Sequence, residues 1–162
     1  LYSLPDVFDE QFPNRANAFQ FDTDTRNIFI CADSKRLLSA FLELLSNAAE
    51  ADNSCGSIQI HSHVNACGHT VTVSVTGKGS LSEINPSEMQ TNPLIDADAP
   101  LTAQLSTPFF STKENHAGLG LSIVAQVCHT HHAGFELYSR NGFTTAGITF
   151  PILAMDDIRN TI

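Results

Sequence analysis

The spacing of apolar residues predicts two amphipathic helices. The first runs from Ser34 to about Asp52, where apolar side chains recur every three or four positions over about five turns, and Asp33 and Ser34 can cap its start. Its apolar stripe consists of Leu37, Leu38, Phe41, Leu44, Leu45 and Ala48. The second helix is expected from Leu119 to about His132, with Gly134 as its C-terminal stop.

Alternation of apolar and polar residues in steps of two predicts the strands. They are expected at residues 18–21, 27–32, 57–64, 70–76, 135–139 and 144–151. The second and third pairs each form a hairpin, with turns at 65–68 and 140–142. Hairpins in succession around two helices indicate an α+β fold: a two-layer α/β sandwich with a mixed sheet and the helices on one face.

Residues 78–117 show no periodicity. Ser, Asn, Pro, Asp and Gln dominate this stretch, which contains Pro86, Pro93, Pro100 and Pro108. Connections of roughly forty residues without secondary structure are rare in compact domains, and those that occur are functional lids or disordered inserts. Both interpretations stay open at this point.

The net charge restricts the ligands that this chain can bind. Its 162 residues include 8 Lys and Arg against 17 Asp and Glu, a formal charge of −9, which disfavours nucleic acid and anionic membranes as partners. The 42% of hydrophobic residues suffice for a single core. A polyphosphate would have to be held locally, by backbone N–H groups, a helix terminus, a metal ion or a few cations.

The cysteines and the first residues of the chain indicate the cellular compartment of the protein. Cys31, Cys55, Cys67 and Cys128 form no C-x-x-C pair, and neither a signal peptide nor an apolar run of about 18 residues occurs. We therefore expect a cytoplasmic setting, without direct membrane contact by this domain. The opening Leu1-Tyr2-Ser3 is not a natural start, so the chain is expected to belong to a longer protein that could be membrane-anchored.

Two groups of residues could bind and activate a phosphorylated ligand. Glu43 and Asn47 lie one turn apart on the polar face of the first helix, where their oxygens could orient a water and hold Mg²⁺. The alternative is that both simply belong to the solvated face of that helix. Gly118-Leu119-Gly120 opens the second helix, whose first-turn N–H groups form an anion site, and Lys113 could add a cation.

Three sequence boxes resemble those of the histidine-kinase branch of the GHKL ATPases. Residues 41–51, FLELLSNAAEA, resemble its N box, residues 107–113, TPFFSTK, its F box, and residues 118–124, GLGLSIV, its second glycine box. The boxes follow the family order within about residues 18–152. The chain is therefore similar to the ATP-binding catalytic domain of a two-component sensor histidine kinase, which has the Bergerat fold.

The resemblance implies a nucleotide pocket between the two helices and beneath the lid. Asn47 would bind Mg²⁺ that bridges the ATP phosphates, and Glu43 would act as the general base. The other residues expected to bind the nucleotide or anchor the lid over it are Gly77, Gly79, Phe109, Phe110, Lys113, Gly118, Leu119 and Gly120. The implied reaction transfers the ATP γ-phosphoryl group to a histidine on a partner domain.

The resemblance also implies the organisation and partners of the protein. Residues 1–17 would be the linker from a dimerisation domain, residues 18–152 the catalytic domain with its lid at 78–117, and residues 153–162 a tail. A phosphoacceptor histidine is expected to be followed by an acidic residue, and none of the seven histidines is. We therefore expect that this chain alone is not a whole kinase. The implied partners are a dimerisation and phosphoacceptor domain and a response regulator.

The first glycine box departs from the family pattern D-x-G-x-G, in which the Asp accepts the adenine amino group. In Gly77-Lys78-Gly79-Ser80-Leu81 the Asp position falls on Gly77 or, in the other alignment, on Val75, and neither has a carboxylate. A further family glycine is replaced at His116-Ala117, where His116 could touch a phosphate or be solvated. A degenerate docking module with weak or no nucleotide binding is therefore the alternative function. A stand-alone GHKL ATPase or serine kinase of the anti-sigma type is a third, disfavoured by the F box.

Two histidine clusters are not used by this hypothesis. The first consists of His61, His63, Cys67 and His69, and the second of Cys128, His129, His131 and His132. Two histidines two apart in a strand share a face, so the first cluster could bind a metal. The second lies near the end of the second helix, where a histidine also interacts favourably with the C-terminal end of the helix dipole. Neither cluster has a recognised ligand spacing.

Overall fold

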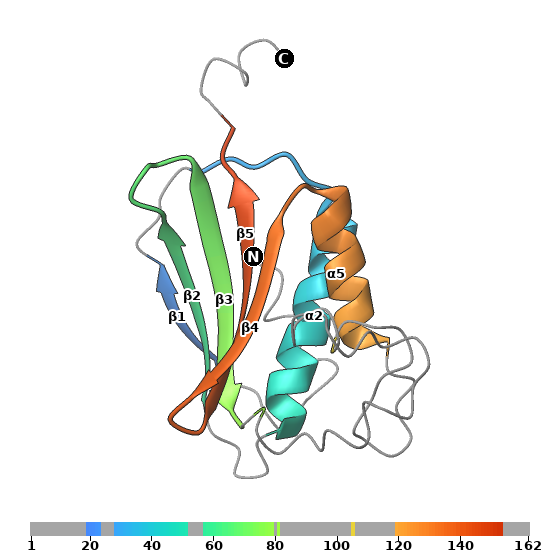
Figure 1. Ribbon diagram of the computed structural model, residues 1–162, viewed down its shortest axis with the longest axis vertical. Helices are drawn as coiled ribbons and strands as arrows, with labels where there is room; N and C mark the ends of the chain where they lie inside the picture. Colours follow the sequence, from blue (N-terminus) through green and yellow to red (C-terminus); the bar gives the residue numbers. More distant parts are fainter. Residues whose placement is uncertain are drawn as a thin grey trace, which may run out of the picture.

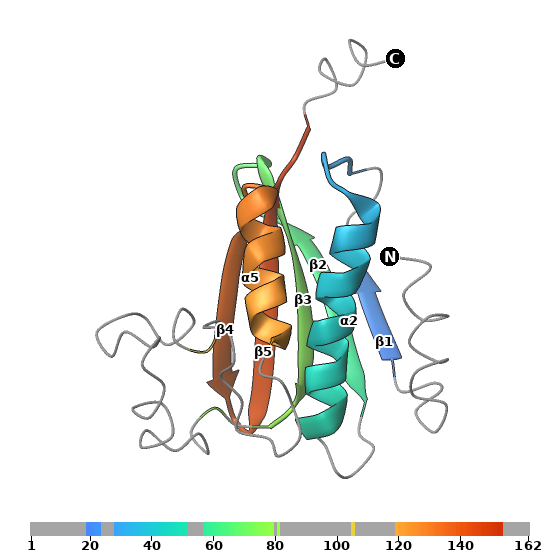
Figure 2. The same cartoon turned by 90° about the vertical axis from the view of Figure 1, so that its right-hand side faces the viewer.

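The computed structural model describes residues 19–23, 28–51, 57–79, 81, 105 and 119–153. Within them the chain forms a five-stranded sheet and two helices that cover one face of it (Figure 1 and Figure 2). The elements are β1 Phe19–Thr23, α2 Ser34–Ala51, β2 Ile58–Val64, β3 Thr70–Lys78, α5 Gly120–Thr130, β4 Gly134–Arg140 and β5 Phe143–Pro151. This two-layer arrangement confirms the predicted fold class.

The sheet is mixed, with the strand order β1-β2-β3-β5-β4. β1 pairs in parallel with β2, and the other neighbouring strands are antiparallel. Both predicted hairpins are present, and the second turns through Asn141 and Gly142, whose φ angles of 54° and 78° suit a two-residue turn. β3 extends to Lys78, opposite Phe143, so the predicted lid begins too early. Pairing with β5 carries the strand through Gly77 and Lys78, where side-chain alternation gives no signal.

Asp33 caps α2 as predicted. Its Oδ1 atom accepts hydrogen bonds from the backbone N–H groups of Arg36 at 3.1 Å and Lys35 at 2.9 Å. The hydrogen bond from Arg36, supported by that from Lys35, favours the ionised carboxylate, so the pKa of Asp33 lies below its usual value.

The hydrophobic core lies between the helices and the sheet. Its buried helical residues are Ala40, Phe41, Leu44, Leu45, Ala49, Val124, Val127 and Cys128. The strands contribute Ile58, Ile60, Val71, Val73, Val75, Ala146, Ile148 and Phe150. Burial raises the pKa of the Cys128 thiol to about 11, so this cysteine is a packing residue and not a nucleophile.

The strand predicted at 27–32 is wrong for its described part. Residues 28–33 join no ladder, although Ile28 and Ile30 pack against the core and Phe29 is 49% exposed. The Phe29 carbonyl accepts a hydrogen bond from the backbone N–H of Leu153 at 2.9 Å. Alternation of apolar and polar residues shows only that one side of a segment faces the core. It occurs whether or not a neighbouring strand pairs with that segment.

The end of α5 also differs from the prediction. The helix ends at Thr130, and the residue with a left-handed backbone is His132, at φ 51°, while Gly134 begins β4. The backbone N–H of Ala133 donates to the Cys128 carbonyl at 2.9 Å, and that of His132 to the His129 carbonyl at 3.3 Å. This pair of hydrogen bonds is a Schellman motif, which needs a residue in the left-handed region but accepts one other than glycine at a cost.

Several predicted segments lie outside the described residues: the linker at 1–17, most of the lid and most of the tail. Within the lid, Leu105 is described and is buried. No helix in the described part of the chain is long and apolar enough to cross a membrane.

Candidate functional site

Three of the predicted site residues meet where α5 begins. Figure 2 shows α5 beside α2, with its first turn level with the C-terminal half of α2. A β-carbon built on Gly120 would lie 2.7 Å from Oε2 of Glu43 and 3.6 Å from Nδ2 of Asn47. Glu43 and Asn47 are both half-buried. They therefore lie against the start of α5 and are not merely part of a solvated helix face.

Among the described residues, the N-cap position of α5 provides no side-chain cap. Leu119 occupies the N-cap position without a side-chain hydrogen bond to the helix, and the Ser122 hydroxyl donates to the Leu119 carbonyl at 2.8 Å. The positive end of the helix dipole thus lies beside the side chains of Glu43 and Asn47, which approach the first residue of α5. The absence of a side chain at residue 120 is what lets these groups approach so closely.

Gly77 lies where α2 crosses β3. A β-carbon there would come within 2.8 Å of the Ala48 β-carbon, 3.2 Å of its Cα and 3.3 Å of its carbonyl oxygen. Gly79 has a φ of +148°, which residues with a side chain rarely adopt, and its added β-carbon would lie 3.2 Å from that of Ala51. The described surroundings of both glycines are therefore those of close helix–sheet packing, and their contact with nucleotide stays a prediction.

The same geometry bears on the missing carboxylate of the first glycine box. Position 77 admits no side chain unless α2 moves, because the nearest atoms include the Ala48 backbone. The other candidate position, Val75, is 2% exposed and is paired with Ala146 in the core. An aspartate at either position would disturb the packing of this chain.

A chain of hydroxyl groups ties the residues after β3 to the β4–β5 hairpin. Thr144 donates to the Gly79 carbonyl at 3.1 Å, so Ser139, 2.7 Å away, donates to the Thr144 hydroxyl and accepts from the Leu81 N–H at 2.9 Å. Gly79 N–H also donates to the Gly142 carbonyl at 2.9 Å. Ser139 and Thr144 are not among the predicted site residues, because only the strand register places Thr144 opposite both Ser139 and Gly77.

Of the remaining predicted site residues, the structure describes only one. Leu119 is described and is 38% exposed directly before α5. Phe109, Phe110, Lys113 and Gly118 lie outside the described residues.

The second histidine cluster has a structural explanation. The ring of His131 uses both nitrogens: Nε2 accepts from the backbone N–H of Asp33 at 2.9 Å, and Nδ1 donates to the Val127 carbonyl at 2.7 Å. This ring links the end of α5 to the start of α2. No three His, Cys, Asp or Glu side chains among the described residues already form a metal-binding group.

Residues 32–154 match the model of the histidine kinase-, DNA gyrase B- and HSP90-like ATPase family. The chain belongs to this ATPase family. It is similar to the sensory histidine kinase/phosphatase NtrB of Rhizobium leguminosarum bv. phaseoli, with 33% identity over 127 residues that cover 75% of this chain and 32% of NtrB. The sensor histidine kinase ZraS of Escherichia coli (strain K12) is 28% identical over 123 residues, which cover 76% of this chain and 22% of ZraS. The chain spans about a third or less of the length of these relatives.

Solved structures agree with the family. The catalytic domain of histidine kinase ThkA has a TM-score of 0.67 and 26% identity, and the match covers 93% of this chain and 91% of that one. The domain is thus an ATP-binding catalytic domain of the sensor histidine kinase type, as its three boxes predicted.

Proposed function

We propose that this domain binds Mg²⁺ and ATP between α2 and α5 and provides the γ-phosphoryl group to a histidine on a partner domain. The observation that supports it best is the close approach of Gly120 to Glu43 and Asn47. A carboxylate, an amide and the N-terminal end of α5 converge there at a residue without a side chain. The donor set suits Mg²⁺ with a polyphosphate, because Mg²⁺ prefers oxygen ligands and helix N–H groups bind anions.

Each of these groups has a distinct task in the proposed reaction. The first-turn N–H groups of α5 hold the phosphates, with Gly120 leaving room for them. Asn47 provides an amide oxygen for Mg²⁺, which, when bound, neutralises phosphate charge. The carboxylate of Glu43 accepts the N–H proton of the attacking imidazole as the new N–P bond forms and ADP leaves. Catalysis then rests on positioning and charge neutralisation.

The proposal extends to residues and partners beyond the described part. Lys113 and Gly118 are assigned to the phosphates, and Phe109 and Phe110 to anchoring the lid over the nucleotide. The partners would be a dimerisation and phosphoacceptor domain and a response regulator, as ThkA has been solved in complex with the response regulator TrrA. A cytoplasmic location follows from this role.

Calorimetric titration of ATP into the chain, with and without Mg²⁺, tests the binding step. We expect one site with a higher affinity when Mg²⁺ is present. Absence of both heat and a thermal shift at about 1 mM ATP would contradict the proposal and leave the degenerate docking module as the better description. Equal affinity for GTP would mean that the pocket works without an adenine selector, in agreement with the lack of a carboxylate at Val75 and Gly77.

Three variants of α2 then separate the roles of its polar residues. Asn47→Ala should remove the Mg²⁺ dependence of ATP binding, whereas Glu43→Gln should bind ATP but fail to phosphorylate an attached dimerisation domain. Glu50→Gln is the matched control, because this exposed carboxylate lies on the same helix and accepts from Ser46 at 3.0 Å. An Asn47→Ala protein whose Mg²⁺ dependence is unchanged would show that the metal assignment is wrong.

A further inference from the structure

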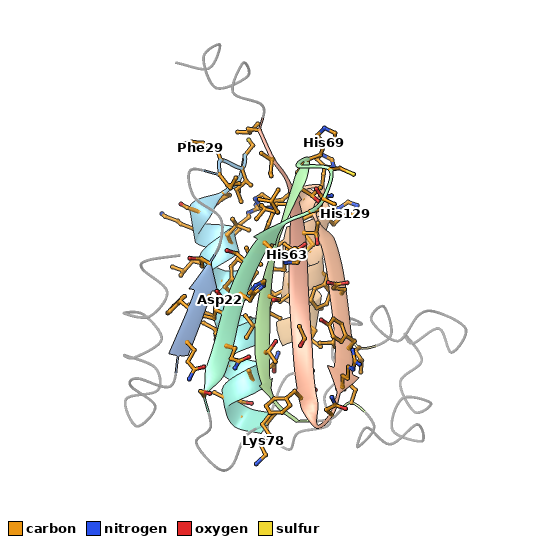
Figure 3. All side chains as sticks on the ribbon, turned by 90° about the vertical axis from the view of Figure 1, so that its left-hand side faces the viewer. Asp22, Phe29, His63, His69, Lys78 and His129 are labelled. Carbon is orange, nitrogen blue, oxygen red and sulfur yellow. The ribbon has the colours of Figure 1, made fainter. Side chains whose placement is uncertain are left out.

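Asp22, His61 and His63 gather on the face of the sheet opposite the helices. Asp22 of β1 is paired in register with His61 of β2, and His63 follows two positions later on the same face. Between them Ser62 is buried towards the helices, as are Ile58 and Ile60. Figure 3 shows Asp22 and His63 on this helix-free face. The group is therefore separated by the sheet from the proposed nucleotide site.

The distances within this group are close to those of ligands that share one metal ion. The His61 and His63 ring centroids are 5.5 Å apart with an interplanar angle of 36°, and Nε2 of His61 lies 3.7 Å from Oδ2 of Asp22. Donor atoms about 2.0 to 2.1 Å from a tetrahedral Zn²⁺ are about 3.4 Å from each other, and two such imidazoles have centroids about 5 Å apart. Rotation of these side chains about their χ angles is still needed to turn all three donors towards one point.

The side chains are free to make this adjustment. The Asp22 side chain is 86% exposed and that of His61 43% exposed, and His63 is also exposed. A pair of this kind on the surface contributes little to stability by itself. As the side chains stand, no three His, Cys, Asp or Glu groups in the described part of the chain are placed to hold a metal ion, so the site requires these side chains to reorient as the cation enters.

We propose that Asp22, His61 and His63 bind one divalent transition-metal cation of the Zn²⁺, Ni²⁺ and Cu²⁺ class. Two imidazoles and a carboxylate suit these borderline cations, whereas Mg²⁺ prefers oxygen ligands alone. β1 is an edge strand whose described pairing is with β2. A cation held by Asp22 and the two histidines would cross-link β1 to β2, so the site couples metal binding to the docking of this edge strand.

Titration of Zn²⁺ alone into the full chain, free of any affinity tag and of nucleotide, tests the proposal. We expect a one-to-one binding component whose affinity falls more than about tenfold in His61→Gln and in His63→Gln, and falls less in Asp22→Asn. His69→Gln is the matched control, because this exposed histidine lies in the turn of the same hairpin. Its affinity should equal that of the parent chain.

Hydrogen exchange supplies a second readout. Zn²⁺ should slow exchange of the β1 amides in the parent chain and in His69→Gln, but not in the His61→Gln/His63→Gln double variant. Melting without metal confirms that the double variant is folded. The proposal is overturned if no Zn²⁺ binds, if the double variant binds as tightly as the parent chain, or if β1 exchange does not respond to Zn²⁺.

Discussion

The close crossing of α2 over β3 makes Gly77→Ala the most informative substitution. The new β-carbon would lie 2.8 Å from the Ala48 β-carbon and little further from the Ala48 backbone, atoms that cannot rotate away. Overpacking of this kind costs about 1 to 3 kcal/mol, and replacing glycine in a strand returns about 0.5 to 1 kcal/mol. The free energy of unfolding should therefore fall, by about 1.25 kcal/mol at the midpoints of these ranges and by at most about 2.5 kcal/mol.

The matched control is Gly134→Ala. Gly134 also lies in a strand, and its added β-carbon would meet only the Thr149 β-carbon, at an ordinary 3.8 Å. This variant should be as stable as the parent chain or slightly more stable. For a chain of this size, thermal melting followed by circular dichroism should show Gly77→Ala lower by about 2 to 8 °C.

A double-mutant cycle with Ala48→Gly tests the cause. Ala48→Gly alone costs about 1 kcal/mol in a helix, but combined with Gly77→Ala it removes the contacting β-carbon. The double variant should therefore lose less free energy of unfolding than the sum of the two single-variant losses. If Gly77→Ala melts like Gly134→Ala, or if the cycle shows no coupling, the crossing is not tight. The steric explanation for the absence of a carboxylate at position 77 would then be refuted.

Four further substitutions probe the site and the helix ends. Gly120→Ala should lower ATP affinity by more than about tenfold but change the melting temperature little, since its β-carbon meets only the movable ends of Glu43 and Asn47; unchanged affinity would contradict the site. His132→Gly should raise the free energy of unfolding by about 0.5 to 1 kcal/mol in urea melts, because glycine relieves its left-handed backbone, and a loss would refute this. Thr144→Val should cost about 1 to 2 kcal/mol by leaving its hydrogen-bond partners unpaired, and a neutral result would show that the hydroxyl chain is unimportant. The lowered pKa of Asp33 means that its ionised form stabilises the fold above about pH 4 and loses this effect as the pH falls through the lowered value; the stability difference from Asp33→Asn in urea melts should therefore shrink on acidification, and a constant difference would exclude this linkage.

The helices, hairpins and family were predictable because their signals are local. The apolar spacing of α2, its Asp33 cap and the Asn141-Gly142 turn each depend on residues a few positions apart. The same locality explains the errors. Alternation at 28–32 could not reveal that this segment lacks a ladder partner. The C-terminal stop of α5 was predicted at Gly134 because glycine favours left-handed backbone, whereas His132 is the residue that adopts it.

The sequence by itself determined the two helices, the two hairpins and the ATPase family, since periodicity and motifs are carried within each segment. Only the tertiary structure decided which of those residues meet. Gly120 lies 77 positions after Glu43, and their approach depends on how α5 packs against α2. Likewise, Asp22 and His61 become neighbours only through the parallel register of β1 and β2. Such contacts depend on ångström-scale packing between distant segments, for which the order of residues along a chain has no local signature.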